Sequence, residues 1–180
     1  MPRLRPLNHP AGRSETLLDQ VQTTMGFVPT LMRVLAHSPA ALRGYLSLRD
    51  TLASGALPIR LREQIAIAVA ATNDCNAYLV SHSRYGRTAG LADEEIAKAQ
   101  HAVSADPASA AALGFARMLL ERRGHVSDAE IAAVRAAGFD DGEIVEIAAA
   151  AALNTFANLV NNLADDSPHT APEAAGHEPN

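Results

Sequence analysis

The sequence predicts an all-α protein of about eight or nine helices. Only 4% of its 180 residues are aromatic and Trp is absent, whereas Ala, Leu and Arg, which favour helices, are frequent. A β-sandwich would need more Val, Ile, Thr and Tyr. Helix-start residues and glycines divide the chain into short amphipathic segments. We expect residues 1–165 to fold as a single domain of the compact multi-helix type, large enough to bury a core.

The N-terminal helices are expected within residues 14–55. Ser14 can cap the first of them, and a short helical turn should follow near residues 31–35. Ser38 then caps a longer helix that has Pro39 at its first position. The residues of this helix that should face the core are Leu42, Tyr45 and Leu46.

A helical hairpin is expected at residues 58–90. Pro58 starts its first helix, which should run to about Thr72. Asn73 or Asp74 is then expected to cap the second helix. The C-terminal helices should occupy residues 106–165.

The starts of several later helices share one local sequence. Asp-x-Glu-Ile occurs at Asp93, Asp128 and Asp141. The spacings differ, so this is a repeated helix-start signal rather than a solenoid repeat. Asp106-Pro107 starts a further long helix. Residues 166–180 have no apolar period, which predicts a disordered tail.

Composition argues against several classes of protein. The net charge of −5 is modest and the basic residues do not cluster, which disfavours nucleic-acid binding. One cysteine excludes an intrachain disulfide and suits a reducing compartment. No signal peptide is recognised, and the longest apolar run, residues 147–153, is shorter than the roughly 18 residues of a membrane span. We therefore expect a cytoplasmic protein that binds no membrane.

The sequence also gives no support for a cofactor or a metal ion. It has no glycine-rich phosphate loop, so nucleotide or flavin binding is not expected. The histidines lack metal-ligand spacing and there is no second cysteine, so a zinc site is not expected either.

The one cysteine, Cys75, follows a predicted helix start at Asn73-Asp74. In the first turn of a helix, free N–H groups and the helix dipole favour a thiolate. His82 lies on the same face two turns on, a rise of about 10 Å that is too long for a direct hydrogen bond. A buried, unreactive cysteine is the alternative interpretation.

Glu63 belongs to the preceding helix and would approach His82 if the two helices form an antiparallel hairpin. Ala66 and Ala70 share its helix face and would permit close contact. A carboxylate there would orient the imidazole and hold its proton. Tyr78 is at i,i+4 to His82. It either fills space in the core or donates a hydrogen bond to a developing oxyanion.

These residues and their spacing resemble the carboxymuconolactone decarboxylase superfamily, and within it the alkylhydroperoxidase D-like, peroxidase-related branch. The family pattern is a Glu followed by Cys-x-x-Cys-x-x-x-His at the start of a helix, usually after an Asn. The matching residues are Glu63, Asn73, Cys75 and His82. The likeness extends over roughly residues 14–165 and includes the stretches 24–29, 60–63, 90–96 and 152–156. It implies the alkylhydroperoxidase D-like helical fold.

The chain departs from this pattern at Tyr78, which replaces the second cysteine. In the family the second cysteine attacks the peroxide and becomes a sulfenic acid. The first cysteine then converts this sulfenic acid into a disulfide. Here three outcomes follow from the resemblance. Cys75 acts alone and is reduced by an external thiol, or Glu63 and His82 transfer protons without sulfur, or the site is inactive and the protein is a helical oligomer.

The leading interpretation is a peroxidase-like antioxidant protein. It would reduce a hydroperoxide or another small substrate through Cys75, with Glu63 and His82 as proton relay and Tyr78 as neighbour. The resemblance also implies a homo-oligomer, a trimer or a hexamer. In the last helix an asparagine stripe is expected to face another helix or a subunit; its members are Asn154, Asn158, Asn161 and Asn162. The alternative is that Asn154 and Asn158 line the pocket.

Overall fold

A computed structural model describes residues 3–165 of the chain. The predicted disordered tail at residues 166–180 lies outside the described residues. Within residues 3–165 the all-α prediction is confirmed, with nine helices and no strand. The helices are α1 (Arg13–Met25), α2 (Thr30–Leu35), α3 (Pro39–Ala53), α4 (Ile59–Thr72), α5 (Asn76–Thr88), α6 (Asp93–Gln100), α7 (Pro107–Glu121), α8 (Asp128–Ala136) and α9 (Asp141–Ala164).

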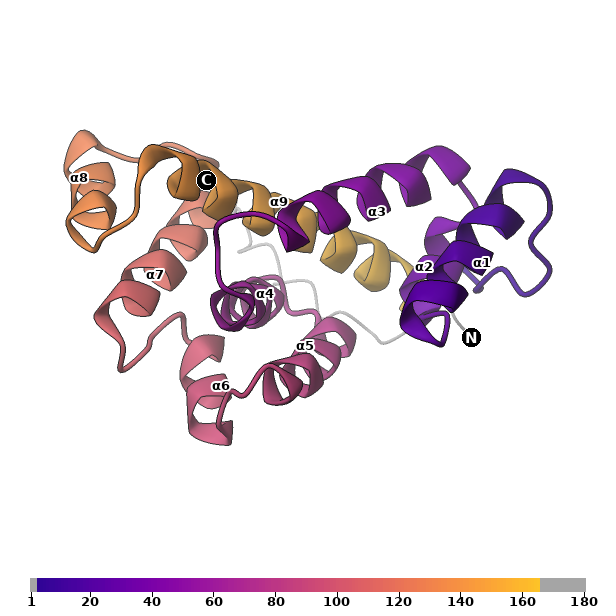
Figure 1. Ribbon diagram of the computed structural model, residues 1–180, viewed down its shortest axis with the longest axis horizontal. Helices are drawn as coiled ribbons and strands as arrows, with labels where there is room; N and C mark the ends of the chain where they lie inside the picture. Colours follow the sequence, from indigo (N-terminus) through magenta and orange to yellow (C-terminus); the bar gives the residue numbers. More distant parts are fainter. Residues whose placement is uncertain (1–2, 166–180) are drawn as a thin grey trace, which may run out of the picture.

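The helices form an elongated bundle around α4 and α9 (Figure 1). α1 and α2 lie at one end and α7 and α8 at the other, while α9 runs between the two ends. α4 packs against α5, α6, α7 and α9. It is correspondingly apolar, with a continuous buried stretch from Gln64 to Ala70. α4 therefore forms the centre of the core.

α9 has a composition that its position explains. It is long and apolar enough to cross a membrane by length and composition alone. However, it packs against α2, α3, α4 and α7, and its buried residues face these helices. Such packing accounts for the apolar composition of a core helix.

Most predicted helix starts are confirmed by their capping bonds. The Ser38 hydroxyl accepts from the Ala41 N–H at 3.2 Å, and the Asp106 carboxylate from the Ser109 N–H at 2.8 Å. Asp-x-Glu-Ile does mark the starts of α6, α8 and α9. At α8 and α9 the residue before it completes a capping box with the Glu.

The predicted cap at Ser14 is wrong. α1 begins at Arg13 after Gly12, and the Ser14 side chain is buried. Its hydroxyl donates to the Ala36 carbonyl at 2.6 Å. Because this bond joins α1 to the end of α2, the side chain is used for tertiary packing rather than for capping.

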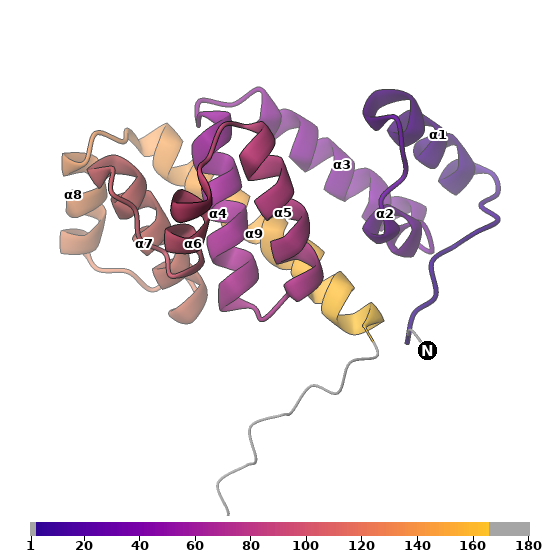
Figure 2. The same ribbon diagram turned by 90° about the horizontal axis from the view of Figure 1, so that it is seen from below.

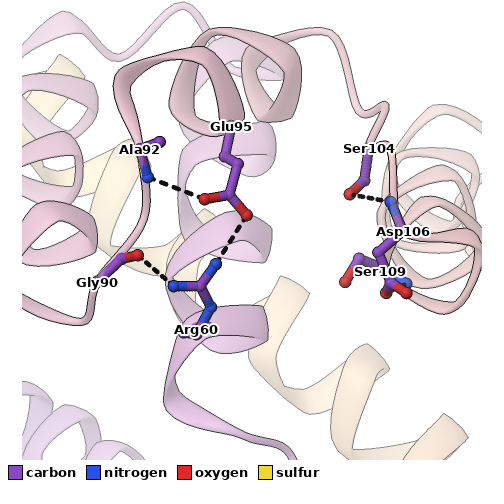
Figure 3. Close-up of polar contacts among 7 residues, drawn as sticks. All are labelled: Arg60, Gly90, Ala92, Glu95, Ser104, Asp106 and Ser109. Carbon is purple, nitrogen blue, oxygen red and sulfur yellow. Dashed lines mark hydrogen bonds and ion pairs between the residues drawn. The ribbon is translucent and has the colours of Figure 1, made fainter.

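Arg60, at the start of α4, connects this helix to the α5–α6 turn (Figure 3). Its guanidinium donates to the Gly90 carbonyl and pairs with Glu95 at 2.7 Å. The Glu95 carboxylate also accepts from the Ala92 N–H at 2.9 Å, which caps α6. The hairpin and α6 are thus held in one arrangement.

The α3–α4 turn is held by a carboxylate from α9. Glu146 accepts from the N–H groups of Ala56 at 3.0 Å and Leu57 at 3.2 Å. A Cβ atom at Gly55 would overlap this carboxylate.

We expect Gly55→Ala to lower the free energy of unfolding by about 1–3 kcal/mol, because the Glu146 carboxylate must leave its donors. Gly44→Ala is the control: no atom lies near its Cβ position in α3, so a gain of about 0.5–1 kcal/mol is expected. Urea unfolding measures the free energy of unfolding of both variants. Equal effects would contradict the role of the Glu146 carboxylate in holding the α3–α4 turn.

Candidate functional site

The candidate site is a cavity of about 790 Å³ between α2, α3, α4, α5 and α9. Most of its lining is apolar. The polar and aromatic side chains that reach it include Tyr45, Arg49, Glu63, Tyr78, Ser81, His82, Arg84, Tyr85, Asn154 and Asn161. A mostly apolar cavity with a few converging polar groups is typical of a small-molecule site.

The α4–α5 hairpin supplies the central residues. Figure 2 shows the two helices side by side, with α9 behind them. The expectation that Asn73 or Asp74 caps α5 is wrong, because Cys75 is the N-cap. Asn73 instead ends α4, and Asp74 takes a left-handed conformation with φ of 50°. The Cys75 N–H then donates to the Ala70 carbonyl at 2.9 Å, which closes the turn.

The hairpin brings Glu63 and His82 together, as its predicted geometry requires. Nδ1 of His82 lies 2.7 Å from Oε2 of Glu63, and the two side chains are only 16% and 17% exposed. Since an ionised carboxylate can only accept, Nδ1 carries the proton. Nε2 then has a free lone pair, and within residues 3–165 it has no hydrogen-bond partner. This arrangement suits a general base.

Tyr78 lies against this pair. Its ring centroid is 4.2 Å from that of His82, at 36° between the planes. Its hydroxyl donates to Oδ1 of Asn154 at 2.7 Å. Burial raises the pKa of Tyr78 well above its usual value, so the phenol is protonated at neutral pH. The Tyr78 ring therefore fills space beside His82, and its hydroxyl makes a polar contact with Asn154.

Cys75 is separated from the cavity. Its side chain is 1% exposed and does not belong to the cavity lining. It packs in a buried cluster to which α1, α2, α3, α4, α5 and α9 contribute side chains. Burial raises the pKa of the Cys75 thiol, so the expectation that the helix start favours a thiolate is wrong. Desolvation outweighs the favourable helix terminus here.

The burial of Cys75 predicts low thiol reactivity. We expect iodoacetamide to alkylate Cys75 about 100-fold more slowly in the folded protein than in urea, because access and the thiolate fraction are both reduced. Intact mass against time measures this. Equal rates in the two states would show that the thiol is exposed in solution.

The asparagine stripe of α9 faces the hairpin of the same chain. Oδ1 of Asn158 accepts from the Asn73 side chain at 3.1 Å, and the Asn162 side chain donates to the Asn73 carbonyl at 2.9 Å. Asn154 and Asn161 line the cavity. The predicted contact of the stripe with another helix is confirmed. The pocket alternative is confirmed for Asn154 but wrong for Asn158, which does not belong to the lining because its side chain binds Asn73 instead.

Several cavity residues were not identified from the sequence as site residues. Tyr45 was assigned to the core, and it is indeed buried. Arg49 and Arg84 bring positive charge to the lining. Arg49 comes from α3 and Arg84 from α5, two helices that both pack against α9, and the sequence carries no spacing signal for this arrangement. Within residues 3–165 no group of three His, Cys, Asp or Glu side chains is placed to hold a metal ion.

Comparison with known proteins identifies the family. The model of the carboxymuconolactone decarboxylase family matches residues 39–121. The structure resembles the alkylhydroperoxidase AhpD core of a peroxidase-related protein from Ralstonia eutropha JMP134. The TM-score is 0.76 at 26% identity, over 87% of this chain and 88% of that one. The family match and this structural likeness together support the carboxymuconolactone decarboxylase superfamily for the chain. Its fold is the alkylhydroperoxidase D-like fold.

Two further solved structures have a similar fold. A peroxidase-related protein from Silicibacter sp. TM1040 has a TM-score of 0.72 at 22% identity, over 88% of this chain and 85% of that one. The debrominase Bmp8 has a TM-score of 0.73 at 20% identity, over 95% and 94%. At these identities the likeness shows the fold alone. No curated protein sequence matches the chain.

Proposed function

We propose that this protein is a cofactor-free acid–base enzyme that transfers a proton at a carbon next to the carbonyl group of a small lactone or carboxylic acid. One observation carries the proposal. The cavity contains a histidine oriented by a carboxylate, His82 with Glu63 at 2.7 Å, whereas the thiol of Cys75 lies outside its lining.

The proposed step needs no group beyond these two side chains. Nε2 of His82 takes the proton from the carbon, and the electron pair of the C–H bond moves onto the carbonyl oxygen to give an enolate. The Glu63 carboxylate stabilises the imidazolium that forms. Return of the proton to carbon, at the same or a neighbouring position, completes the reaction.

The charge of the cavity supports an acidic substrate. Arg49 and Arg84 belong to the lining, and a guanidinium binds carboxylates well. Asp50 pairs with Arg49 at 2.8 Å. The third arginine of the lining, Arg62, donates to three backbone carbonyls between α3 and α4, so Arg84 is the cation better placed to bind a substrate carboxylate. The family also bears the name of a decarboxylase.

A one-cysteine peroxidase is the second candidate. Two observations favour it: the structural relative of 26% identity is named peroxidase-related, and Cys75 packs in the same buried cluster as Tyr78, which lines the cavity. In this reaction the Cys75 thiolate attacks a hydroperoxide, gives a sulfenic acid and releases an alcohol, and an external thiol then reduces the sulfur. The buried thiol would first have to become accessible.

The experiment that tests the proposal is a screen for carbon–proton exchange. A panel of small lactones and keto acids is incubated with the protein in D2O and followed by NMR. In parallel, the reduced protein receives one equivalent of an organic hydroperoxide and a sulfenic-acid trap. Exchange without trapping supports acid–base chemistry. Rapid trapping without exchange supports the peroxidase instead.

A further inference from the structure

The cavity has an apolar wall that the proposed proton transfer does not use. This wall comes from residues 25–32, which run from the last residue of α1 into α2. Apart from Thr30, the lining residues of this segment are all apolar: Met25, Phe27, Val28, Pro29, Leu31 and Met32. α2 packs against α3 and α9, whereas α5, which carries His82, packs against α4, α6 and α9. The apolar wall and the acid–base pair therefore belong to separate parts of the lining.

The apolar wall reaches from the core to the solvent. Leu31 and Met32 are buried, whereas Phe27 is 48% exposed, and so is Ile59, at the start of α4, to 55%. All four side chains belong to the lining of the cavity. Single exposed apolar side chains are normal on a protein surface, but these two extend an apolar surface that enters a cavity. Such a surface is typical of a site for the apolar part of a ligand.

The size of the cavity also indicates a ligand larger than the reacting group alone. A volume of about 790 Å³ lies in the range of sites that bury most of a drug-sized molecule. A lactone ring or a short keto acid would fill only part of it and leave water against the apolar wall. Each methylene group placed there removes apolar surface from water, which favours binding.

The charges of the lining favour a ligand with one carboxylate. Both acidic side chains of the lining are engaged by basic ones, Glu63 by His82 at 2.7 Å and Asp50 by Arg49 at 2.8 Å. Arg84 is exposed, and among residues 3–165 its guanidinium forms no ion pair. The charge left over in the lining is therefore positive, which suits a carboxylate.

We infer that the substrate is an amphiphilic carboxylic acid, whose carboxylate binds Arg84 and whose apolar chain or ring lies against residues 25–32 and Ile59. The inference rests on the proposed function, since it takes the cavity of Glu63 and His82 as the substrate site. It commits the apolar wall to one occupant, the substrate. A second copy of the chain that covers Phe27 and Ile59 is the competing occupant, and the experiment distinguishes the two.

The test measures binding, so it does not depend on turnover. Butanoate, hexanoate, octanoate and decanoate are titrated into the wild-type protein and followed by calorimetry. We expect the affinity to rise by about two- to fourfold for each added methylene group, because each buries further apolar surface. Arg84→Gln should weaken the binding of all four acids by the same factor, about two- to fivefold for an exposed ion pair, and leave the rise with chain length unchanged.

Phe27→Ala tests the apolar wall itself. We expect it to weaken octanoate binding by about 3- to 10-fold and butanoate binding by less than about twofold, because only the longer chain covers the ring. Ile59→Ala should act in the same direction from α4. Val103→Ala is the matched control, since Val103 is also 48% exposed and lies between two helices but outside the lining. Its affinities should stay within about twofold of wild type, and circular dichroism checks the fold of each variant.

The outcomes separate this inference from the proposed function. An affinity that does not rise with chain length overturns the inference, and so do equal effects of Phe27→Ala and Val103→Ala. If Phe27→Ala dissociates an oligomer in sedimentation and leaves octanoate binding unchanged, a second copy covers the wall and the inference fails. Chain-length-dependent binding without any carbon–proton exchange supports the apolar site and counts against the proposed reaction.

Discussion

His82→Gln is expected to lower the rate of carbon–proton exchange by about 10²–10⁴-fold, the usual contribution of a general base. Glutamine has no basic nitrogen, so the substrate proton has no acceptor. The variant should fold, because His82 is partly exposed. Glu63 loses its partner in this variant, but its carboxylate belongs to the cavity lining and not to the closed core. Initial rates measured by NMR in D2O, with thermal unfolding as the folding check, give the result.

Glu63→Gln should lower the same rate by a smaller factor. The amide keeps the shape of the side chain and a contact to Nδ1 of His82. It does not stabilise the imidazolium, however, and it permits the other tautomer of the ring. A larger loss in Glu63→Gln than in His82→Gln would make Glu63 the base and contradict the assigned roles.

Tyr78→Cys is expected to create hydroperoxide reduction in a protein that otherwise lacks it or performs it slowly. Tyr78 lines the cavity beside His82, so the introduced thiol would face substrate, whereas Cys75 does not. It would attack the hydroperoxide and release an alcohol, and the resulting sulfenic acid would condense with Cys75 to a disulfide that an added dithiol reduces.

The cost of this substitution is a loss of buried volume and of the bond to Asn154, about 3–5 kcal/mol by analogy with truncation of large buried aromatic side chains. Circular dichroism must therefore show a folded variant. Peroxide consumption with the added dithiol, compared with the variant Tyr78→Cys/Cys75→Ser, tests the prediction. A folded Tyr78→Cys variant that consumes no peroxide would show that the second cysteine is not what separates this chain from the thiol mechanism.

The sequence predicted those parts of the fold that depend on neighbouring residues. Ser38 and Asp106 cap helices because their side chains reach N–H groups three residues on, a purely local geometry. Ser14 fails as a cap because the Ala36 carbonyl, far along the chain, takes its hydroxyl. Asn73 fails for a similar reason, since the Asn158 side chain of α9 accepts from its amide.

In the candidate site too, the features that depend on neighbouring elements were predictable and those that depend on distant elements were not. Glu63 and His82 lie on two helices joined by a short turn, so their approach could be predicted from the hairpin alone. The surroundings of Tyr45 and Cys75 could not, because they depend on α3 and α9, which are distant in the sequence. Burial of Cys75 is the reason that the proposed function uses the imidazole of His82 and not the thiol.

The measurement that tests the central claim most directly is the exchange rate of Cys75→Ser. The substitution removes the thiol and leaves the cavity, Glu63 and His82 in place. We predict a rate within about twofold of wild type, because a residue outside the cavity lining does not touch the substrate and contributes little to the reaction. Loss of the activity in a folded Cys75→Ser variant would contradict proton transfer by His82 and Glu63 alone and return the chemistry to the thiol.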